Sequence, residues 1–419
     1  MTGSGSDQQG PGGKRVQAVV LSGGGASGAY EVGVLKALLS GSRPPLEPKV
    51  FAGTSIGCFN STFMVSVWDA HGPSAIGVLE QFWLERLATT RGRLRESICR
   101  FRGNPLDLLD PWAYVPDPLR PLRLLAGDGF HLFFEALRRA AYLATGEGDL
   151  IARLTNLLDA SALLATERWE EITANLDYAS VRSSSRELCT VATNYQTGAA
   201  VYFTNKDMTD ERGPLAVRAS AAIPGILPAV MIGAAPHVDG GVVMNTPLTL
   251  AIQAQAKPTE VHMIYLDPAV GEIPMASLGS TIDTSYRQEL IGWAKAINEN
   301  IEAVRRINQS LLALERLRRS QAGRGIDFEA MGRDLHTARL RPLVVHRYHP
   351  TDDLAGGALG LLNFTREHIE KLITRGFHDG THHDCREAKC VLLEESDTVS
   401  AGRGDQPSPS PAAGAGRAA

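Results

Sequence analysis

The chain has 419 residues and a formal net charge of −4, and 43% of its residues are hydrophobic while 21% are charged. This composition is typical of a soluble globular protein with one large domain or two small ones, and it excludes a wholly disordered chain. The small net charge gives no indication of a nucleic-acid partner. Five cysteines without a C-x-x-C pair favour a reducing compartment, so we expect a cytoplasmic protein.

The two ends of the chain are predicted to be disordered tails. Residues 1–15 are rich in Gly and Ser, and the tail assigned to residues 391–419 ends in Gly, Ala, Ser and Pro. No secretory signal peptide is predicted, because no apolar stretch follows the basic residues near the start. The longest uncharged stretch, Ala219–Pro236, contains three prolines and is a poor membrane-spanning helix. Any membrane contact is therefore expected to be peripheral.

A unit of strand, glycine turn and helix is predicted twice near the start of the chain. Val16–Leu21 is short and apolar, as a buried strand is, and a helical pattern of apolar residues follows the glycine-rich residues 22–28. Val50–Ala52 leads in the same way through Gly53–Gly57 into a second helical pattern. Two such units in succession predict an α/β fold with a central, mostly parallel sheet.

The later elements follow an Arg-rich segment broken by prolines, which we interpret as a helical insertion at about residues 91–148. Leu188–Asn194 and Ala199–Thr204 predict a hairpin. Val261–Leu266 and Pro342–Arg347 predict two more strands, and apolar residues between them recur at the spacing of a long helix.

Ser55 lies in the pattern Gly53-x-Ser55-x-Gly57, between an apolar strand and a helix. This context lets a serine occupy a strained turn that presents its Oγ at a helix N-terminus, as nucleophilic serines do. Glycines suit the flanking positions, because a side chain there would meet the neighbouring backbone. A serine that merely caps the helix would show the same pattern, so the motif alone leaves both interpretations open.

Gly23, Gly24, Gly25 and Gly28 follow the first strand. Their backbone N–H groups could point at an anion, such as the oxyanion of the tetrahedral intermediate in acyl transfer. The spacing also matches a dinucleotide-binding loop, but that site needs an acidic residue where the second strand of this chain ends in Gly53-Thr54-Ser55. We therefore favour an oxyanion loop, and we expect no cofactor.

Asp239 precedes two glycines and follows an apolar segment. It could be an ordinary turn residue. It could also be the base for Ser55, provided that apolar surroundings raise its pKa above the usual value of about 3.9. The sequence does not decide between these interpretations.

These residues together resemble the patatin-like phospholipase family. The resemblance is carried by four segments in the family's order: GGGASGAYEVGVL at 23–35, GTSIG at 53–57, ASAAIPGILP at 219–228 and VDGGVVMNTP at 238–247. Residues 361–380 are also similar to the family's terminal helix. The Arg-rich insertion and the long helix are not covered.

The resemblance implies a three-layer α/β/α fold with a helical insertion and C-terminal helices. It implies hydrolysis of acyl esters in phospholipids or other lipids, without metal or cofactor. Ser55 would be the nucleophile and Asp239 the proton acceptor. Gly23, Gly24, Gly25 and Gly28 would form the oxyanion hole, Gly53 and Gly57 the nucleophile elbow, and Gly240 and Gly241 a supporting loop.

The resemblance also implies a division of the chain. Residues 16–275 would form the catalytic domain, which contains the insertion. Residues 276–340 would form a helical extension, and residues 341–390 a strand and a helix that pack back on the catalytic domain.

Three features leave alternatives open. The family commonly has Arg or Lys at the position of Ser27, so the chain could be a scaffold that binds lipid with little or no turnover.

His237 lies two residues before Asp239, on the same face of an extended segment. The alternative mechanism is therefore that of a Ser-His-Asp esterase of the α/β-hydrolase type. The third feature is a basic cluster that suits anionic lipid headgroups, although a solvated helical cap is favoured; it contains Arg93, Arg95 and Arg102.

Metal-ligand residue types gather near the end of the ordered chain. They are His378, His382, His383, Cys385 and Cys390. The ligand types suit zinc, but no recognised zinc-binding spacing is present. The sequence therefore favours a solvated helix end, and no metal site is predicted.

Overall fold

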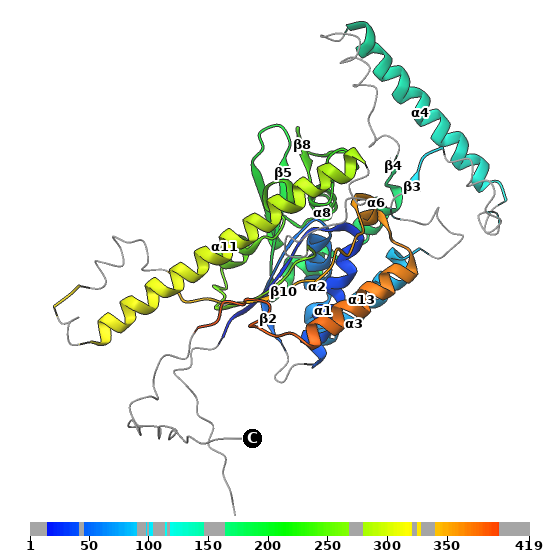
Figure 1. The fold of residues 1–419 in the computed structure, drawn as a ribbon. Coiled ribbons are helices and arrows are strands. Elements are labelled where there is room, and N and C mark those ends of the chain that lie inside the picture. The colour runs from blue at the N-terminus through cyan, green and yellow to red at the C-terminus, as the bar shows by residue number, and fades with distance from the viewer. Residues whose placement is uncertain are drawn as a thin grey trace, which may run out of the picture.

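A computed structural model of the chain describes residues 15–41, 46–89, 98, 100–103, 114, 118–145, 164–267, 280–320, 325–327 and 340–393. The tails expected at 1–15 and 391–419 lie outside these ranges except for their inner ends. The described elements form three layers, with a central sheet between two groups of helices (Figure 1). The expected α/β/α architecture is thereby confirmed.

The central sheet has the strand order β10-β9-β1-β2-β5-β8-β7, and β6 pairs with β5 beside this path. Five strands from β10 to β5 run parallel, whereas β8 and β6 are antiparallel to β5. The sheet is therefore mostly parallel, as expected. The strands are β1 (Gln17–Leu21), β2 (Pro48–Thr54), β5 (Glu187–Asn194), β6 (Ala200–Thr204), β7 (Val230–Ile232), β8 (Ala235–Val238), β9 (Glu260–Ile264) and β10 (Val344–Tyr348).

Both faces of the sheet are apolar. Successive side chains of a strand point to opposite faces, and in the buried strands both sets of side chains are apolar. In β1, Val19 and Leu21 belong to one core, while Ala18 and Val20 belong to the other. A strand buried on both faces reads as a continuous apolar run, which explains why Val16–Leu21 could be identified from the sequence.

One face of the sheet is covered by α1 (Gly28–Gly41), α2 (Ile56–His71), α3 (Ala75–Phe82) and α13 (Arg366–Thr381). The other face is covered by α10 (Leu248–Gln253) and by α11 (Thr281–Arg319), which crosses the sheet and extends beyond it (Figure 1). The apolar residues of α11 that contact the sheet core include Ile297, Ile301 and Val304. They follow the helical spacing that predicted the long helix.

Shorter elements connect these layers. The helices are η1 (Gly25–Ser27), η2 (Gly72–Ser74), η3 (Trp83–Leu87), α6 (Glu167–Ala174), α7 (Tyr178–Ser183), η8 (Asn205–Asp207), α8 (Arg212–Ser220), α9 (Gly241–Met244) and η11 (Ala358–Leu362). The hairpin predicted from Leu188 to Thr204 is confirmed, because β5 and β6 pair antiparallel.

The region expected to be an insertion is described in part. It contains β3 (Arg100–Phe101), which pairs with β4 (Leu164–Ala165), and α4 (Arg120–Thr145), which projects away from the layers around the sheet (Figure 1). Arg93 and Arg95 lie outside the described residues. None of the described helices combines the length and the apolar character needed to cross a membrane.

Candidate functional site

The loops that carry the predicted site residues meet at one edge of the sheet. Leu21 at the end of β1 lies between Gly53 of β2 and Ile264 of β9 in the parallel register. The carboxyl ends of these strands therefore lie side by side, and ligands of open α/β sheets bind at this edge. The glycine loop after β1 and the Ser55 turn after β2 become neighbours although they are distant in sequence.

Ser55 occupies a strained turn between β2 and α2. Its φ of 56° and ψ of −125° are unusual for a residue with a side chain. The turn is tight, because a Cβ added at Gly57 would lie 2.6 Å from the carbonyl oxygens of both Leu21 and Ser22, and one at Gly53 would meet the carbonyl of Gly57. A helix cap needs no such strain, so the geometry favours a nucleophile elbow over the capping interpretation.

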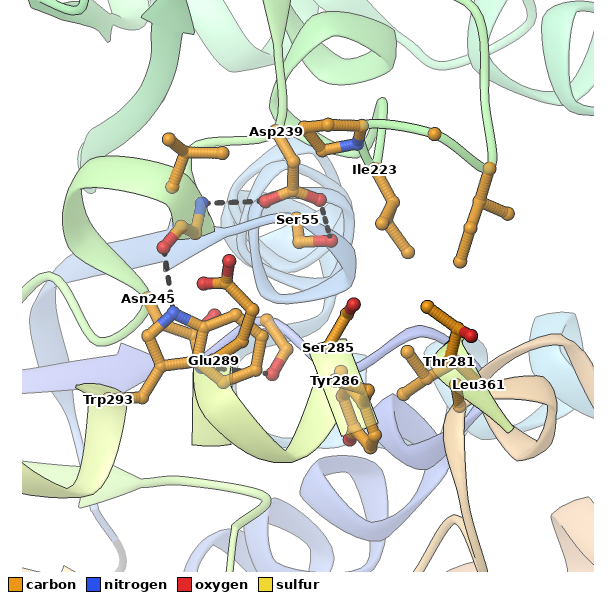
Figure 2. Close-up of a pocket in the computed structure, with 18 residues that line it drawn as sticks. Ser55, Ile223, Asp239, Asn245, Thr281, Ser285, Tyr286, Glu289, Trp293 and Leu361 are labelled. Atoms are coloured by element: carbon orange, nitrogen blue, oxygen red, sulfur yellow. Dashed lines mark hydrogen bonds between the residues drawn. The ribbon is translucent and has the colours of Figure 1, made fainter. Parts of the chain in front are cut away.

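Asp239 accepts a hydrogen bond from Ser55. The Ser55 Oγ donates to Asp239 Oδ2 at 2.7 Å, and the Gly241 N–H donates to Oδ1 at 2.6 Å (Figure 2). The end of α8 holds this loop, since the Asp239 N–H donates to the Ala222 carbonyl at 2.9 Å and the Gly240 N–H donates to the Ser220 carbonyl at 3.1 Å. Burial raises the pKa of Asp239 to about 7, although its two hydrogen bonds lower it.

The glycine loop lies directly against Ser55. A Cβ added at Gly23 would lie 2.9 Å from the Ser55 Cβ. The Gly23 N–H already donates to the Asn245 carbonyl at 3.1 Å, and the Gly28 N–H bonds to carbonyls of its own helical turn. Among the described residues, the amides of Gly24 and Gly25 have no acceptor. Of the four glycines, Gly24 and Gly25 are therefore the ones whose amides remain available to an oxyanion.

A cavity of about 340 Å³ opens above Ser55 and Asp239 (Figure 2). Its walls come from the glycine loop, from residues 223–226, from the Asp239 loop, from η11 and from the first turns of α11. The sequence did not connect the long helix with the site, yet α11 contributes Tyr286, Glu289 and Trp293 to the lining. The Trp293 Nε1–H donates to the Gly241 carbonyl at 2.8 Å and so anchors α11 to the Asp239 loop.

Ser55 also lines a smaller pocket of about 40 Å³. Its lining is apolar apart from Ser55 itself. The other residues that surround it are Gly25, Ile56, Ile98, Trp169, Ala221, Ile223, Leu227, Leu361, Leu362 and Phe364. Ser55 therefore lines both the larger cavity and this small apolar recess.

Ser220 and Asn245 are two further site residues that sequence reasoning did not single out. The Ser55 N–H donates to Ser220 Oγ at 3.0 Å, and that hydroxyl donates to the Val191 carbonyl at 2.6 Å. Asn245 Nδ2 lies 3.3 Å from Asp267 Oδ2 and 3.5 Å from the Gly23 carbonyl. Both residues belong to segments that carried the family resemblance, so their position in those segments was the signal available.

In the described part of the chain, His237 contacts the backbone of its own strand rather than Ser55 or Asp239. It lies on β8, and its Nδ1 is 2.9 Å from the Ala235 carbonyl. Among the described residues no histidine lines the cavity, so they supply no third member for a Ser-His-Asp arrangement. Ser27 is buried in η1, and within the described part of the chain no Lys or Arg lines the cavity in its place. The zinc-type residues near the end of the chain also lie outside the cavity lining.

Comparisons with known proteins give a family match and a structural neighbour. Residues 19–252, more than half of the chain, match the family model of the patatin-like phospholipases. Among solved structures, VipD from Legionella pneumophila is similar with a TM-score of 0.39 and 13% sequence identity, over 88% of this chain and 66% of that chain. No curated protein matches the sequence. The extent of the family match shows that the chain belongs to the patatin-like phospholipase family.

Proposed function

We propose that the chain is a lipid acyl hydrolase that cleaves carboxylic ester bonds with Ser55 as nucleophile and Asp239 as proton acceptor. Membership of the family supports hydrolysis in general. The observation that carries the specific assignment is the 2.7 Å hydrogen bond from the Ser55 hydroxyl, on a strained turn, to the Asp239 carboxylate. A carboxylate with a pKa of about 7 is a far better proton acceptor than an ordinary aspartate.

The reaction would proceed in two stages. The Ser55 Oγ attacks the ester carbonyl while its proton moves to Asp239, and the resulting oxyanion accepts hydrogen bonds from the amides of Gly24 and Gly25. The intermediate collapses to an acyl-enzyme, and Asp239 returns the proton to the departing alcohol. Water then attacks the acyl-enzyme, Asp239 takes a proton from that water, and the carboxylic acid leaves as Ser55 is reprotonated.

The size and lining of the cavity suit a substrate with an apolar body and a polar ester. Its volume of about 340 Å³ falls within the range of small-molecule sites, about 300 to 1,000 Å³. The narrow recess beside Ser55 offers an apolar surface to the start of an acyl chain. Phospholipids and other lipid esters have this construction.

We also propose that the enzyme meets lipid at a membrane surface, through α4. Phe130, Phe133, Phe134 and Leu137 are exposed and follow the spacing of one helix face. An exposed apolar stripe on a helix with basic residues is typical of interfacial binding. The described cysteines are free thiols, which supports a cytoplasmic location.

The test compares purified wild type with Ser55→Ala and Asp239→Asn on a short-chain nitrophenyl ester and on phosphatidylcholine. Both variants are expected to lose at least about 100-fold in kcat. Ser66→Ala is the matched control, because Ser66 lies on α2 and bonds to its own helix at the Phe63 carbonyl. Activity that survives in Ser55→Ala would exclude this mechanism.

A fluorophosphonate probe distinguishes an enzyme from a scaffold of the same fold, because the probe reacts only with an activated serine. We expect labelling of the wild type and of Ser66→Ala, and none of Ser55→Ala. Tight lipid binding by a chain that is not labelled would favour the scaffold.

A further inference from the structure

Four metal-ligand side chains converge outside the cavity, where the segment after α13 returns to the edge strand β10. They are His346, His383, Cys385 and Cys390. His346 comes from β10, and the other three come from the turns that follow α13. All four offer a ligand atom, and these atoms lie within 4.8 Å of one another. All four side chains are half-buried.

The distances in this cluster fit a tetrahedral centre. His346 Nδ1 lies 3.4 Å from Cys385 Sγ, and His383 Nε2 lies 3.4 Å from both Cys385 Sγ and Cys390 Sγ. Zinc bonds of about 2.3 Å to sulfur and about 2.0 Å to nitrogen place tetrahedral ligands about 3.5 Å apart. A pair of thiols with a pair of imidazoles is also the donor set that zinc prefers in closed sites.

The backbone of the segment holds the two cysteines together. The Cys390 N–H donates to the Cys385 carbonyl at 2.9 Å, and the Asp384 carboxylate accepts the Arg386 N–H at 2.6 Å. The next residue, Val391, pairs with Val345 of β10 through two hydrogen bonds of 2.9 Å. The chain is thus fastened on one side of the cluster by a β-bridge and on the other by α13.

The ligand residues of the cluster are contacted by neighbouring groups of the kind that orient zinc ligands in proteins. His346 directs Nδ1 toward Cys385, while its Nε2 lies 3.2 Å from Glu260 Oε1. A carboxylate on the far nitrogen of a ligating histidine sets its tautomer and ring orientation. The Arg347 N–H donates to Cys390 Sγ at 3.2 Å, which is the contact that a metal-bound thiolate accepts. The rings of Tyr348 and His383 pack at a centroid distance of 4.2 Å.

We propose that His346, His383, Cys385 and Cys390 bind one zinc ion that fastens the C-terminal segment to the sheet. The site would be structural, because four protein ligands leave no open position for water or substrate. The sequence did not predict it, because His346 lies on a strand far from the other three and supplies the ligand that completes the set. His378 and His382, which the sequence grouped with them, do not belong to the cluster.

The first test is the metal content of the full chain, purified without a histidine tag, under reducing conditions, from zinc-supplemented medium. We expect about one zinc per chain to remain bound through gel filtration. Cys385→Ser and His346→Ala are expected to lose most of it. His382→Ala is the matched control, because His382 lies in the same segment but bonds to the His378 carbonyl at 2.9 Å. Zinc content that is unchanged in Cys385→Ser, or reduced as much in His382→Ala, would overturn the proposal.

The wild-type chain provides a second test that does not depend on how the variants fold. Replacement of zinc by Co²⁺ is expected to give thiolate-to-cobalt charge-transfer absorption and the visible bands of a tetrahedral ion. An octahedral cobalt spectrum would contradict the site. A Cys385–Cys390 disulfide in protein freshly purified without oxidant, detected by mass spectrometry, would contradict it as well.

Chelation separates this site from the ester chemistry of Ser55. Removal of zinc is expected to lower the melting temperature of the chain, since zinc bound to the folded state stabilises that state. Hydrolysis of a soluble ester is expected to continue while the zinc-free chain stays folded. If hydrolysis stops in a folded, zinc-free chain, the structural assignment is wrong.

Discussion

At the scale of single residues, the proposed role of Asp239 as proton acceptor predicts that hydrolysis depends on pH near neutrality. Only the deprotonated carboxylate can accept the Ser55 proton, and burial raises its pKa to about 7. We therefore expect kcat/KM to rise as the pH increases through about 7 and to level off above it. The measurement is the pH profile of kcat/KM on an uncharged short-chain ester. A profile that is flat from about pH 5 to 9 would exclude Asp239 as the base.

We expect Ser220 to be a positioning residue for Ser55, the proposed nucleophile. Its hydroxyl accepts the Ser55 N–H at 3.0 Å and so helps to hold the strained turn. In Ser220→Ala this buried N–H loses its acceptor, and we expect kcat to fall by about 10-fold or more with little change in KM. Ser183→Ala is the control, because Ser183 is an exposed helical serine that bonds to the Ala179 carbonyl. An increase in KM alone would indicate a binding role instead.

The residues that could be predicted from sequence are those with a local signature. Ser55 and Asp239 stand beside glycines that shape their turns, so their patterns were visible. Ser220 and Trp293 have no such pattern, because their side chains form hydrogen bonds with distant parts of the chain. The sequence also could not show that the Gly23 amide is already hydrogen-bonded, because its acceptor is the distant Asn245 carbonyl.

At the scale of elements, a buried polar network joins the helices beneath the site. The Glu31 carboxyl on α1 accepts a hydrogen bond from Asn60 Nδ2 of α2 at 2.9 Å, and Trp83 Nε1–H of η3 donates to Asn60 Oδ1 at 2.9 Å. Burial raises the pKa of Glu31 well above its ordinary value. The folded chain therefore keeps Glu31 protonated at pH values where the unfolded chain has lost the proton.

This difference predicts a pH-dependent effect of Glu31→Gln on stability. Above the ordinary glutamate pKa of about 4.3, the wild type loses stability as the pH rises, because only its unfolded state gains the ionised form. The variant does not lose stability in this way. The difference between its free energy of unfolding and that of the wild type is therefore expected to grow by up to about 1.4 kcal/mol per pH unit. Urea unfolding of both chains between about pH 4 and pH 7 measures it. A difference independent of pH would show that Glu31 is ionised in the fold.

The apolar stripe of α4 predicts binding to lipid vesicles. Replacement of Phe130, Phe133 and Phe134 by Ser removes most of its aromatic surface, and we expect co-sedimentation with phosphatidylcholine vesicles to weaken by at least about 10-fold. Hydrolysis of a soluble ester should not change. The control replaces Tyr195 and Tyr202, two exposed aromatic residues near the β5-β6 hairpin, by Ser. Equal loss in the control would show that the binding is not specific to α4.

Arg102, the described member of the basic cluster, contributes less to this expectation than the sequence pattern suggested. Arg102 forms ion pairs with Asp128 at 3.6 Å and with Glu167 at 2.7 Å. A guanidinium that is paired with carboxylates attracts an anionic lipid headgroup less strongly than a free one. The proposal of membrane contact therefore rests on the exposed phenylalanines of α4. Periodicity predicted the long helix, but it could not show that α11 reaches the cavity or that α4 carries an exposed apolar stripe.

At the scale of the whole molecule, the parallel sheet assembles the site, and its central part was predictable. Two strand-turn-helix units imply adjacent parallel strands, and β1 and β2 are adjacent. The antiparallel pairing of β8 with β5 places Asp239 at the site, and no local sequence pattern indicates this pairing. The family resemblance implied that a strand and a helix of residues 341–390 pack back on the catalytic domain, but not that β10 lies beside β9 and α13 against α1. These contacts join residues far apart in the chain.

Contacts between α13 and α1 predict that residues beyond the family match are part of the catalytic fold. A Cβ at Gly376 of α13 would meet the Tyr30 carbonyl of α1, and the Tyr30 hydroxyl donates to Asp379 Oδ2 at 3.0 Å. Gly376→Ala would therefore separate two buried helices, and we expect it to lower the free energy of unfolding by about 1–3 kcal/mol.

The matched control for Gly376→Ala is Gly77→Ala in α3, where a Cβ meets nothing within 4 Å. That change is expected to leave stability unchanged or to raise it by up to about 1 kcal/mol, because Ala is the better helix former. Urea unfolding of the two variants beside the wild type measures both effects. Because α1 begins at the glycine loop, Gly376→Ala should also reduce kcat for the soluble ester, whereas Gly77→Ala should not. Equal stability and equal kcat in the two variants would mean that α13 is dispensable for the site.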